Sequence, residues 1–238
     1  LRPQEGRILV LGDEPVNFLE QTKARIGYVP QSERVYPWLK VRQLVDYTAS
    51  FYPRWNKPLV DHLLPDWELD PRDKVGLLSE GQAQKLSIIL ALGHEPEFLV
   101  FDEPVASLDP AARRKFLKTI LDIVSNRDCT IFFSTHITSD LERVADRVAL
   151  LKDGRIDFCG ELDALKDEVK RLRIVSSVPL AQGFDVSGLL HCELSKYEAI
   201  VSVRGFHAEV KEQIERQFNA QVDVEDLNLE EIFLELHA

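Results

Sequence analysis

The stretch FLVFDEP, residues 98–104, places four apolar residues directly before two adjacent carboxylates. An apolar run of this length that ends in charged residues is typical of a buried strand reaching the surface. In open parallel sheets, ligands bind beyond the carboxyl ends of the strands, where Asp102 and Glu103 fall. Successive residues at a strand end point to different sides, so one carboxylate could hold Mg²⁺ while the other acts as a general base toward water. A solvated acidic turn is the alternative explanation.

Strands and helices alternate on either side of this stretch. After it, the pattern predicts strands over 130–134 and 147–151, with helices over 111–124 and 140–144. Strands that alternate with helices and are apolar on both faces predict a parallel sheet covered on both sides, hence an α/β fold. Before it, the pattern predicts strands over 7–11 and 25–29 and a small helical section with helices over 41–51 and 57–64.

The last third of the chain has a different pattern. Asp153-Gly154 predicts a tight hairpin turn, and a charged helix over 161–172 is expected to follow it. Beyond that helix we expect a small α+β module with strands over 173–177, 189–194 and 199–203 and helices over 207–218 and 229–236. The predicted domains are an α/β domain over 1–160 with a helical subdomain at about 32–95, a linker helix over 161–172, and an accessory domain over 173–238.

Other polar residues lie near predicted strand and helix ends. His136 follows the strand over 130–134, at the edge of the sheet where the acidic pair is expected. Ser79 and Gln82 fit a capping box, which explains them structurally, yet a helix start with a serine hydroxyl and Gly81 is also suited to an anion. Asp109 before Pro110 fits a helix N-cap. Gln31 could be an ordinary loop residue.

Composition limits the classes of partner. The chain has 40 acidic and 29 basic side chains and a net charge of −11, which opposes a phosphate backbone, so we expect no nucleic-acid partner. No apolar run approaches the roughly 20 residues that a membrane-spanning helix needs. We therefore expect a soluble protein without direct membrane insertion, which could still dock on a membrane protein.

Five short motifs occur in one order: VPQ (29–31), LSEGQ (78–82), FLVFDEP (98–104), SLDP (107–110) and STH (134–136). Their order and spacing resemble the nucleotide-binding subunit of ABC transporters, over Arg7 to about Gly160. The stretch FYPRWN (51–56) and the ending NLEEIFLELHA (228–238) look like a bacterial exporter-type branch of that family. The resemblance implies an ABC-type P-loop NTPase core with an inserted helical subdomain, and ATP and Mg²⁺ as cofactors.

The resemblance also implies a role for each matched residue. Asp102 would support Mg²⁺, Glu103 would be the general base, and His136 would contact the γ-phosphate. Gln31 would touch Mg²⁺ or its water and sense the permease. A helix start containing Ser79, Gly81 and Gln82 would bind ATP held by the opposite subunit of a head-to-tail dimer, and Asp109 would lie at that dimer seam.

Two substitutions and one absence depart from the family pattern. Glu80 stands where the family often has glycine, and Val105 replaces a common small hydroxylated residue. The phosphate-binding loop G-x-x-x-x-G-K-[ST] does not occur in the 238 residues. In the family this loop precedes a segment like residues 1–7, so we expect the chain to be truncated at its N-terminus. The alternative is a natural variant that binds no nucleotide in its own site.

The functional hypotheses follow from these alternatives. The first is an ABC-type ATPase subunit that works as a homodimer or with a paralogous ATPase subunit. It would couple hydrolysis to a separate membrane permease, in the cytoplasm at the inner face of the cell membrane. The second is a non-catalytic docking or regulatory subunit. A third, an ABC-type ATPase of DNA repair or translation, is disfavoured because Gln31 and Ser79 are too close in sequence for a long coiled-coil insertion and because the net charge has the wrong sign.

Overall fold

The computed structural model describes residues 3–31, 36–126, 128–180 and 186–237. Its internal contacts divide the chain into two units, Leu1–His136 and Ile137–Ala238, and each unit is described by itself. The sequence pattern placed a domain boundary at 160 instead. That boundary, the linker and the accessory domain remain predictions.

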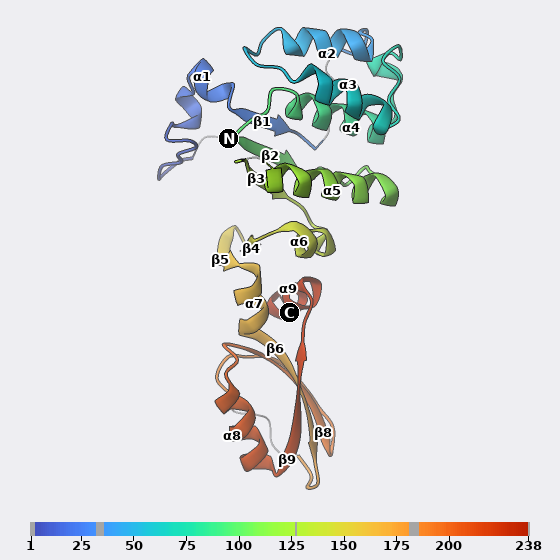
Figure 1. Cartoon of the computed structure of the whole chain (residues 1–238). Coiled ribbons are helices and arrows are strands. Elements are labelled where there is room, and N and C mark those ends of the chain that lie inside the picture. The colour runs from blue at the N-terminus through green and yellow to red at the C-terminus, as the bar shows by residue number, and fades with distance from the viewer. Residues whose placement is uncertain (1–2, 32–35, 127, 181–185, 238) are drawn as a thin grey trace. The chain divides into compact units, whose positions relative to one another are not determined.

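The first unit is a parallel sheet with helices (Figure 1). The strand order is β1-β2-β3, all parallel, with Val29 opposite Phe101 and Asp102 opposite Ser134. Its elements are η1 (Pro15–Asn17), α1 (Glu20–Lys23), β1 (Ile26–Val29), α2 (Val41–Ala49), α3 (Lys57–Asp66), η2 (Val75–Leu77), α4 (Glu80–Leu92), β2 (Phe98–Asp102), α5 (Pro110–Asn126) and β3 (Thr130–Ser134). The predicted α/β fold and the helical section are confirmed, although residues 32–35 of that section lie outside the described residues.

The parallel sheet has one buried face. Val29, Leu99 and Phe101 are at most 1% exposed, and the ring of Phe101 meets that of Phe116 on α5 edge to face. On the other face, Tyr28 and Phe132 are 58% and 59% exposed. Among the described residues, the packing covers the first face and leaves apolar side chains exposed on the other.

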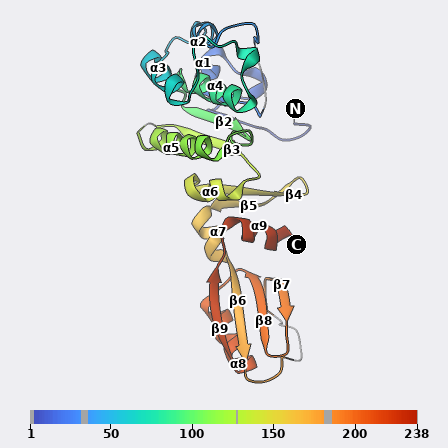
Figure 2. The ribbon, with the colours of Figure 1, turned by 90° about the vertical axis from the view of Figure 1, so that its right-hand side faces the viewer.

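The second unit combines a hairpin, a four-stranded antiparallel sheet and four helices among its described residues. Its elements are α6 (Thr138–Val144), β4 (Arg147–Lys152), β5 (Arg155–Glu161), α7 (Leu162–Glu168), β6 (Val169–Ser176), β7 (Leu189–Leu194), β8 (Glu198–Arg204), α8 (Ala208–Phe218), β9 (Ala220–Asp226) and α9 (Leu229–His237). The larger sheet has the order β7-β8-β6-β9 (Figure 2). Leu172 and Val201 of this sheet belong to a buried cluster that also contains Ile214 of α8.

Two predicted strands differ in the structure. The segment 7–11 is not a strand: among the described residues, its one ladder contact is the isolated bridge between Val10 and Asp13. A strand needs a hydrogen-bonded neighbour, and the described residues supply this segment with no longer pairing. The strand at 147–151 exists as β4, but it pairs antiparallel with β5 rather than joining the parallel sheet. The turn between them, with φ of 49° at Asp153 and 75° at Gly154, allows this local pairing.

The charged helix is shorter than predicted, and one strand was missed. The helix ends at Glu168 rather than 172, because residues from Val169 onward pair with both β8 and β9. Strand β9 was missed because AQVDVED carries three acidic residues and only short apolar signals. This strand is held by its antiparallel hydrogen bonds to β6, a pairing that its own sequence does not indicate.

Candidate functional site at the carboxyl ends of the parallel strands

The carboxyl ends of β1, β2 and β3 bring four predicted residues to one edge of the sheet. Strand β2 lies in the middle, so Asp102 and Glu103 leave the sheet between the ends of its neighbours. Gln31 is exposed and follows Val29, the last residue of β1, by two positions. His136 follows Ser134, the last residue of β3, by two positions.

Ser134 joins the two central strand ends. Its hydroxyl donates a hydrogen bond to Oδ1 of Asp102 at 2.8 Å. The backbone N–H of Glu103 donates to the carbonyl oxygen of Ser134 at 3.1 Å, and lies 3.3 Å from its hydroxyl. The sequence interpretation gave Ser134 no role. Its place opposite Asp102 in the strand register is the signal that would have found it.

Glu103 and His136 form the pair at the centre of this edge. Nδ1 of His136 lies 3.0 Å from Oε2 of Glu103, an ion-pair distance when the imidazole is protonated. The Glu103 side chain is 19% exposed and that of His136 is 73% exposed. Within the described residues, Oε2 of Glu103 is buried and accepts no hydrogen bond of good geometry.

The backbone at Glu103 sets the direction of that side chain. Its φ is 48°, in the left-handed region that residues with a Cβ seldom occupy. The chain therefore turns sharply as it leaves β2. Asp102 stays in register with Ser134, whereas Glu103 turns toward His136.

The remaining predicted residues form a second group at the starts of α4 and α5. Oγ of Ser79 accepts a hydrogen bond from the Gln82 N–H at 3.2 Å, and Oε1 of Gln82 accepts one from the Ser79 N–H at 2.9 Å. The predicted capping box is confirmed. A Cβ on Gly81 would lie 2.9 Å from the carbonyl oxygen of Ser107, so this glycine lets the start of α4 lie against the loop that leads to Asp109.

Asp109 caps α5, as its position before Pro110 predicted. Its Oδ1 accepts hydrogen bonds from the N–H groups of Ala111 and Ala112, each at 2.9 Å. The hydrogen bond from Ala112, with smaller contributions from Ala111 and the charge of Lys85, holds the pKa of Asp109 below its usual value. The carboxylate is therefore kept ionised for this capping role.

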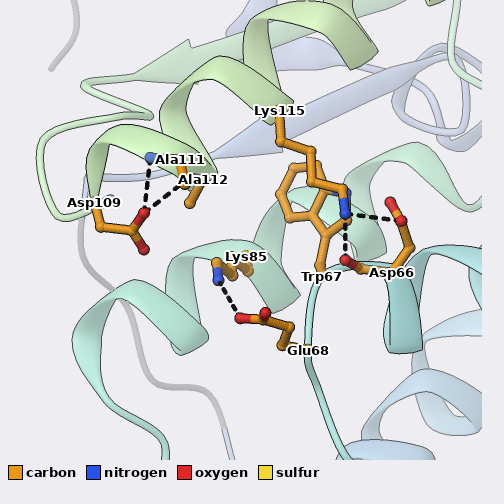
Figure 3. A pocket seen from close by; sticks show the side chains of 8 residues that line it. All are labelled: Asp66, Trp67, Glu68, Lys85, Asp109, Ala111, Ala112 and Lys115. Atoms are coloured by element: carbon orange, nitrogen blue, oxygen red, sulfur yellow. Dashed lines mark hydrogen bonds and ion pairs between the residues drawn. The ribbon is translucent and has the colours of Figure 1, made fainter.

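A pocket of about 180 Å³, which the sequence interpretation missed, lies beside Asp109 (Figure 3). Nζ of Lys115 binds the Asp66 carboxylate at 2.8 Å. Nζ of Lys85 lies 3.9 Å from Oε2 of Glu68. The lining residues are Asp66, Trp67, Glu68, Lys85, Asp109, Ala111, Ala112 and Lys115. Most of the charges around it face an opposite charge, so we interpret the pocket as a structural junction of α4 and α5 with the C-terminal end of α3.

Several known proteins are similar to this chain. Residues 1–106 match the ABC transporter family. The Nod factor export ATP-binding protein I of Bradyrhizobium diazoefficiens is 30% identical over 250 residues, a match that covers 99% of this chain and 79% of the relative. The chain belongs to the family of ABC transporter ATP-binding proteins. Six of the predicted site residues lie within the part matched to this family: Gln31, Ser79, Gly81, Gln82, Asp102 and Glu103.

Two further ABC proteins show how far the likeness extends. The uncharacterized ABC transporter ATP-binding protein YxlF of Bacillus subtilis (strain 168) is 31% identical over 173 residues, which cover 71% of this chain and 56% of YxlF. The matched part thus spans little more than half of that relative. A solved ATP binding subunit of an ABC transporter superposes with a TM-score of 0.64 at 26% identity, over 70% of this chain and 71% of that chain. The predicted ABC-type fold is confirmed.

Within residues 3–31, 36–126, 128–180 and 186–237, no helix is both long enough and apolar enough to cross a bilayer.

Proposed function

We propose that this chain is the ATP-binding and ATP-hydrolysing subunit of an ABC transporter. The observation that carries the proposal is the pair formed by Glu103 and His136 next to Asp102, at the carboxyl edge of a parallel sheet. Family membership supports it. The subunit would act in a head-to-tail dimer, with a second copy or a paralogous subunit, and would drive a separate membrane permease.

The residues at this edge suit Mg²⁺ and a water molecule beside it. Mg²⁺ is bound in proteins through one or two carboxylates, together with substrate phosphates and water. Asp102 offers a carboxylate that Ser134 orients by a hydrogen bond, and Gln31 offers a side-chain oxygen at the end of the neighbouring strand. Glu103, which directly follows Asp102, offers a second carboxylate for a water beside the metal.

Phosphoryl transfer to water depends mainly on positioning and charge stabilisation. In this reaction Glu103 would orient the attacking water and accept its proton, because its carboxylate is held at a fixed angle by the turn after β2. His136, held beside Glu103, would donate a hydrogen bond to the terminal phosphate. Asp102 would hold the metal on the opposite side of the chain.

The second group would act on the nucleotide of the partner subunit. Ser79, Gly81 and Gln82 begin α4, whose N-terminal N–H groups and dipole favour an anion. Asp109 would lie at the seam between the subunits. The contact of Gly81 with the Ser107 carbonyl would then link the phosphate-binding helix start to the loop at that seam.

Calorimetry of the complete gene product tests this proposal directly. We expect saturable binding of ATP that weakens when EDTA removes Mg²⁺, since the metal shields the repulsion between phosphates and the acidic pair. Hydrolysis should follow on the same sample. If no ATP binds, the proposal is lost and the non-catalytic docking subunit becomes the better description.

An exposed row of aromatic side chains on the helical subdomain supports a permease as partner. Trp38, Tyr47 and Phe51 are 68%, 43% and 65% exposed. The rings of Trp38 and Tyr47 both meet Tyr36 edge to face, and Tyr47 meets Phe51 in the same way. We call these four residues the aromatic row. Contiguous exposed apolar surface of this kind marks interaction sites, and the row begins five positions after Gln31 in the sequence.

Changing both Trp38 and Phe51 to serine should weaken co-purification with the permease at least about tenfold, because large aromatic anchors carry much of the binding energy of an interface. ATP hydrolysis without the permease should stay within about twofold of the wild type. Leu121→Ser, at a residue 43% exposed on α5, is the matched control for loss of surface apolar area. Equal recovery of the permease with the double variant and the control would remove the aromatic row from the proposal.

Docking of the aromatic row on a permease would place the protein at the inner face of the membrane. The word export in the name of the Bradyrhizobium relative supports an exporter.

A further inference from the structure

The last residue of the aromatic row is bonded directly to a residue that packs inward. Phe51 is 65% exposed, whereas Tyr52, the next residue, is half-buried and stacks on the imidazole of His94. The two ring centroids are 4.0 Å apart and the ring planes differ by 16°. His94 is 5% exposed and lies two positions after Leu92, where α4 ends. One peptide bond and one ring contact therefore join the aromatic row to the C-terminal end of α4.

His94 also holds strand β1. Its Nε2 lies 3.1 Å from the carbonyl oxygen of Ile26, the first residue of β1. Burial lowers the pKa of His94, and the hydrogen bond to Ile26 offsets this only in part. The imidazole is therefore neutral at neutral pH, and Nε2 carries the hydrogen that it donates to the carbonyl. A Cβ on Gly27 would lie 2.9 Å from the carbonyl oxygen of Ala91, so β1 and the end of α4 also lie close along their backbones.

Trp55 and Asn56 fix the loop that carries Tyr52. The indole of Trp55 lies over Gly93, where a Cβ would come within 2.6 Å of Cζ2 of the indole. The N–H of Asn56 donates to the carbonyl oxygen of Gly93 at 2.7 Å. Oδ1 of Asn56 accepts a hydrogen bond from the N–H of Leu59 at 2.9 Å and so caps α3. The start of α3, the end of α4 and the start of β1 thus meet at one place.

We propose that Tyr52, Trp55 and His94 form a joint through which docking at the aromatic row acts on β1, and thereby on Gln31 two positions beyond that strand. This inference rests on the proposed function, and all of these residues belong to the first unit. The three residues of the joint are positioning residues, since they act on the site through β1. Coupling between two sites is reciprocal. Mg²⁺ and ATP bound at the carboxyl edge of the sheet must therefore change the surroundings of the aromatic row.

Two substitutions at Tyr52 give a matched test of this reciprocal effect. Tyr52→Phe keeps a flat ring against His94, whereas Tyr52→Leu keeps an apolar side chain but removes the ring face. The complete gene product is labelled with fluorotyrosine, and fluorine NMR follows Tyr47 of the aromatic row before and after Mg²⁺ and ATP are added. We expect the Tyr47 signal to shift in the wild type and in Tyr52→Phe, and to shift at least about threefold less in Tyr52→Leu. Equal shifts in the two variants, or no shift in a wild-type sample that calorimetry shows to bind ATP, would overturn the inference.

Hydrogen exchange of the β1 amides separates the joint from the proposed function. In the free protein, these amides should exchange about tenfold faster in Tyr52→Leu than in Tyr52→Phe, because loss of the stacked ring loosens His94 and its hydrogen bond to Ile26. This measurement needs no nucleotide. Absence of ATP binding by calorimetry would remove the proposed function, whereas equal exchange in the two variants would remove the joint itself.

A second pair of variants covers the case in which Tyr52→Leu fails to fold. His94→Gln keeps a side-chain N–H for the Ile26 carbonyl but removes the stacked ring. His62→Gln makes the same chemical change at an exposed residue of α3. Faster β1 exchange and a smaller shift of the Tyr47 signal are expected only for His94→Gln. The same exchange and the same shift in both variants would contradict the role of the joint.

Discussion

Changing Glu103 to glutamine is expected to lower kcat for ATP hydrolysis about 10²- to 10⁴-fold, the usual contribution of a general base. Glutamine keeps the size of the side chain but cannot accept a proton from water. ATP should still bind, because Asp102 retains its carboxylate and its hydrogen bond from Ser134. Release of inorganic phosphate measures the first effect, and calorimetry of the same sample measures the second.

Glu97 provides the control for this variant. It directly precedes β2 at the other end of the strand and pairs with Arg25 at 2.7 Å. Glu97→Gln makes the same chemical change away from the site, so kcat should remain within about twofold of the wild type. If Glu103→Gln kept more than about a tenth of the wild-type kcat, Glu103 would not be the base.

The largest loss of stability is expected for Phe116→Ala. Phe116 lies on α5, is 0% exposed, and its ring centroid is 5.5 Å from that of Phe101. Removing a buried aromatic ring lowers the free energy of unfolding by about 3–5 kcal/mol through lost burial and the cavity left behind. Phe101 immediately precedes Asp102, so the variant should also loosen the strand end that carries the acidic pair. Urea unfolding of the complete gene product measures the change.

Phe51→Ala is the comparison for this prediction. Phe51 is 65% exposed, so the same substitution should lower the free energy of unfolding by less than about 1 kcal/mol. A similar loss for both phenylalanines would show that burial against Phe101 is not what makes Phe116 important.

The acidic pair and the histidine could be placed together from the sequence because parallel strands end at one edge of a sheet. FLVFDEP and STH each read as the end of a strand, and the structure pairs those strands in register, with Asp102 opposite Ser134. The capping residues Ser79, Gln82 and Asp109 were likewise readable, since helix caps depend on local residues.

What the sequence could not supply depends on long-range contacts. The segment RILVL contains the short apolar run that is typical of a strand, yet a strand forms only with a neighbour, and an apolar run does not say whether one is present. The same limit explains β4, whose partner proved to be β5. The 3.0 Å approach of His136 to Glu103 and the junction of Lys115 with Asp66 depend on side-chain directions that no local pattern encodes.

The backbone conformation at position 103 bears on why a carboxylate stands there. A residue with a Cβ in the left-handed region costs roughly 1 kcal/mol more than glycine would. For folding alone, glycine or asparagine would be the cheaper choice at the end of β2. On the proposed function, this strained backbone presents the carboxylate of the general base, so position 103 would trade conformational ease for reactivity.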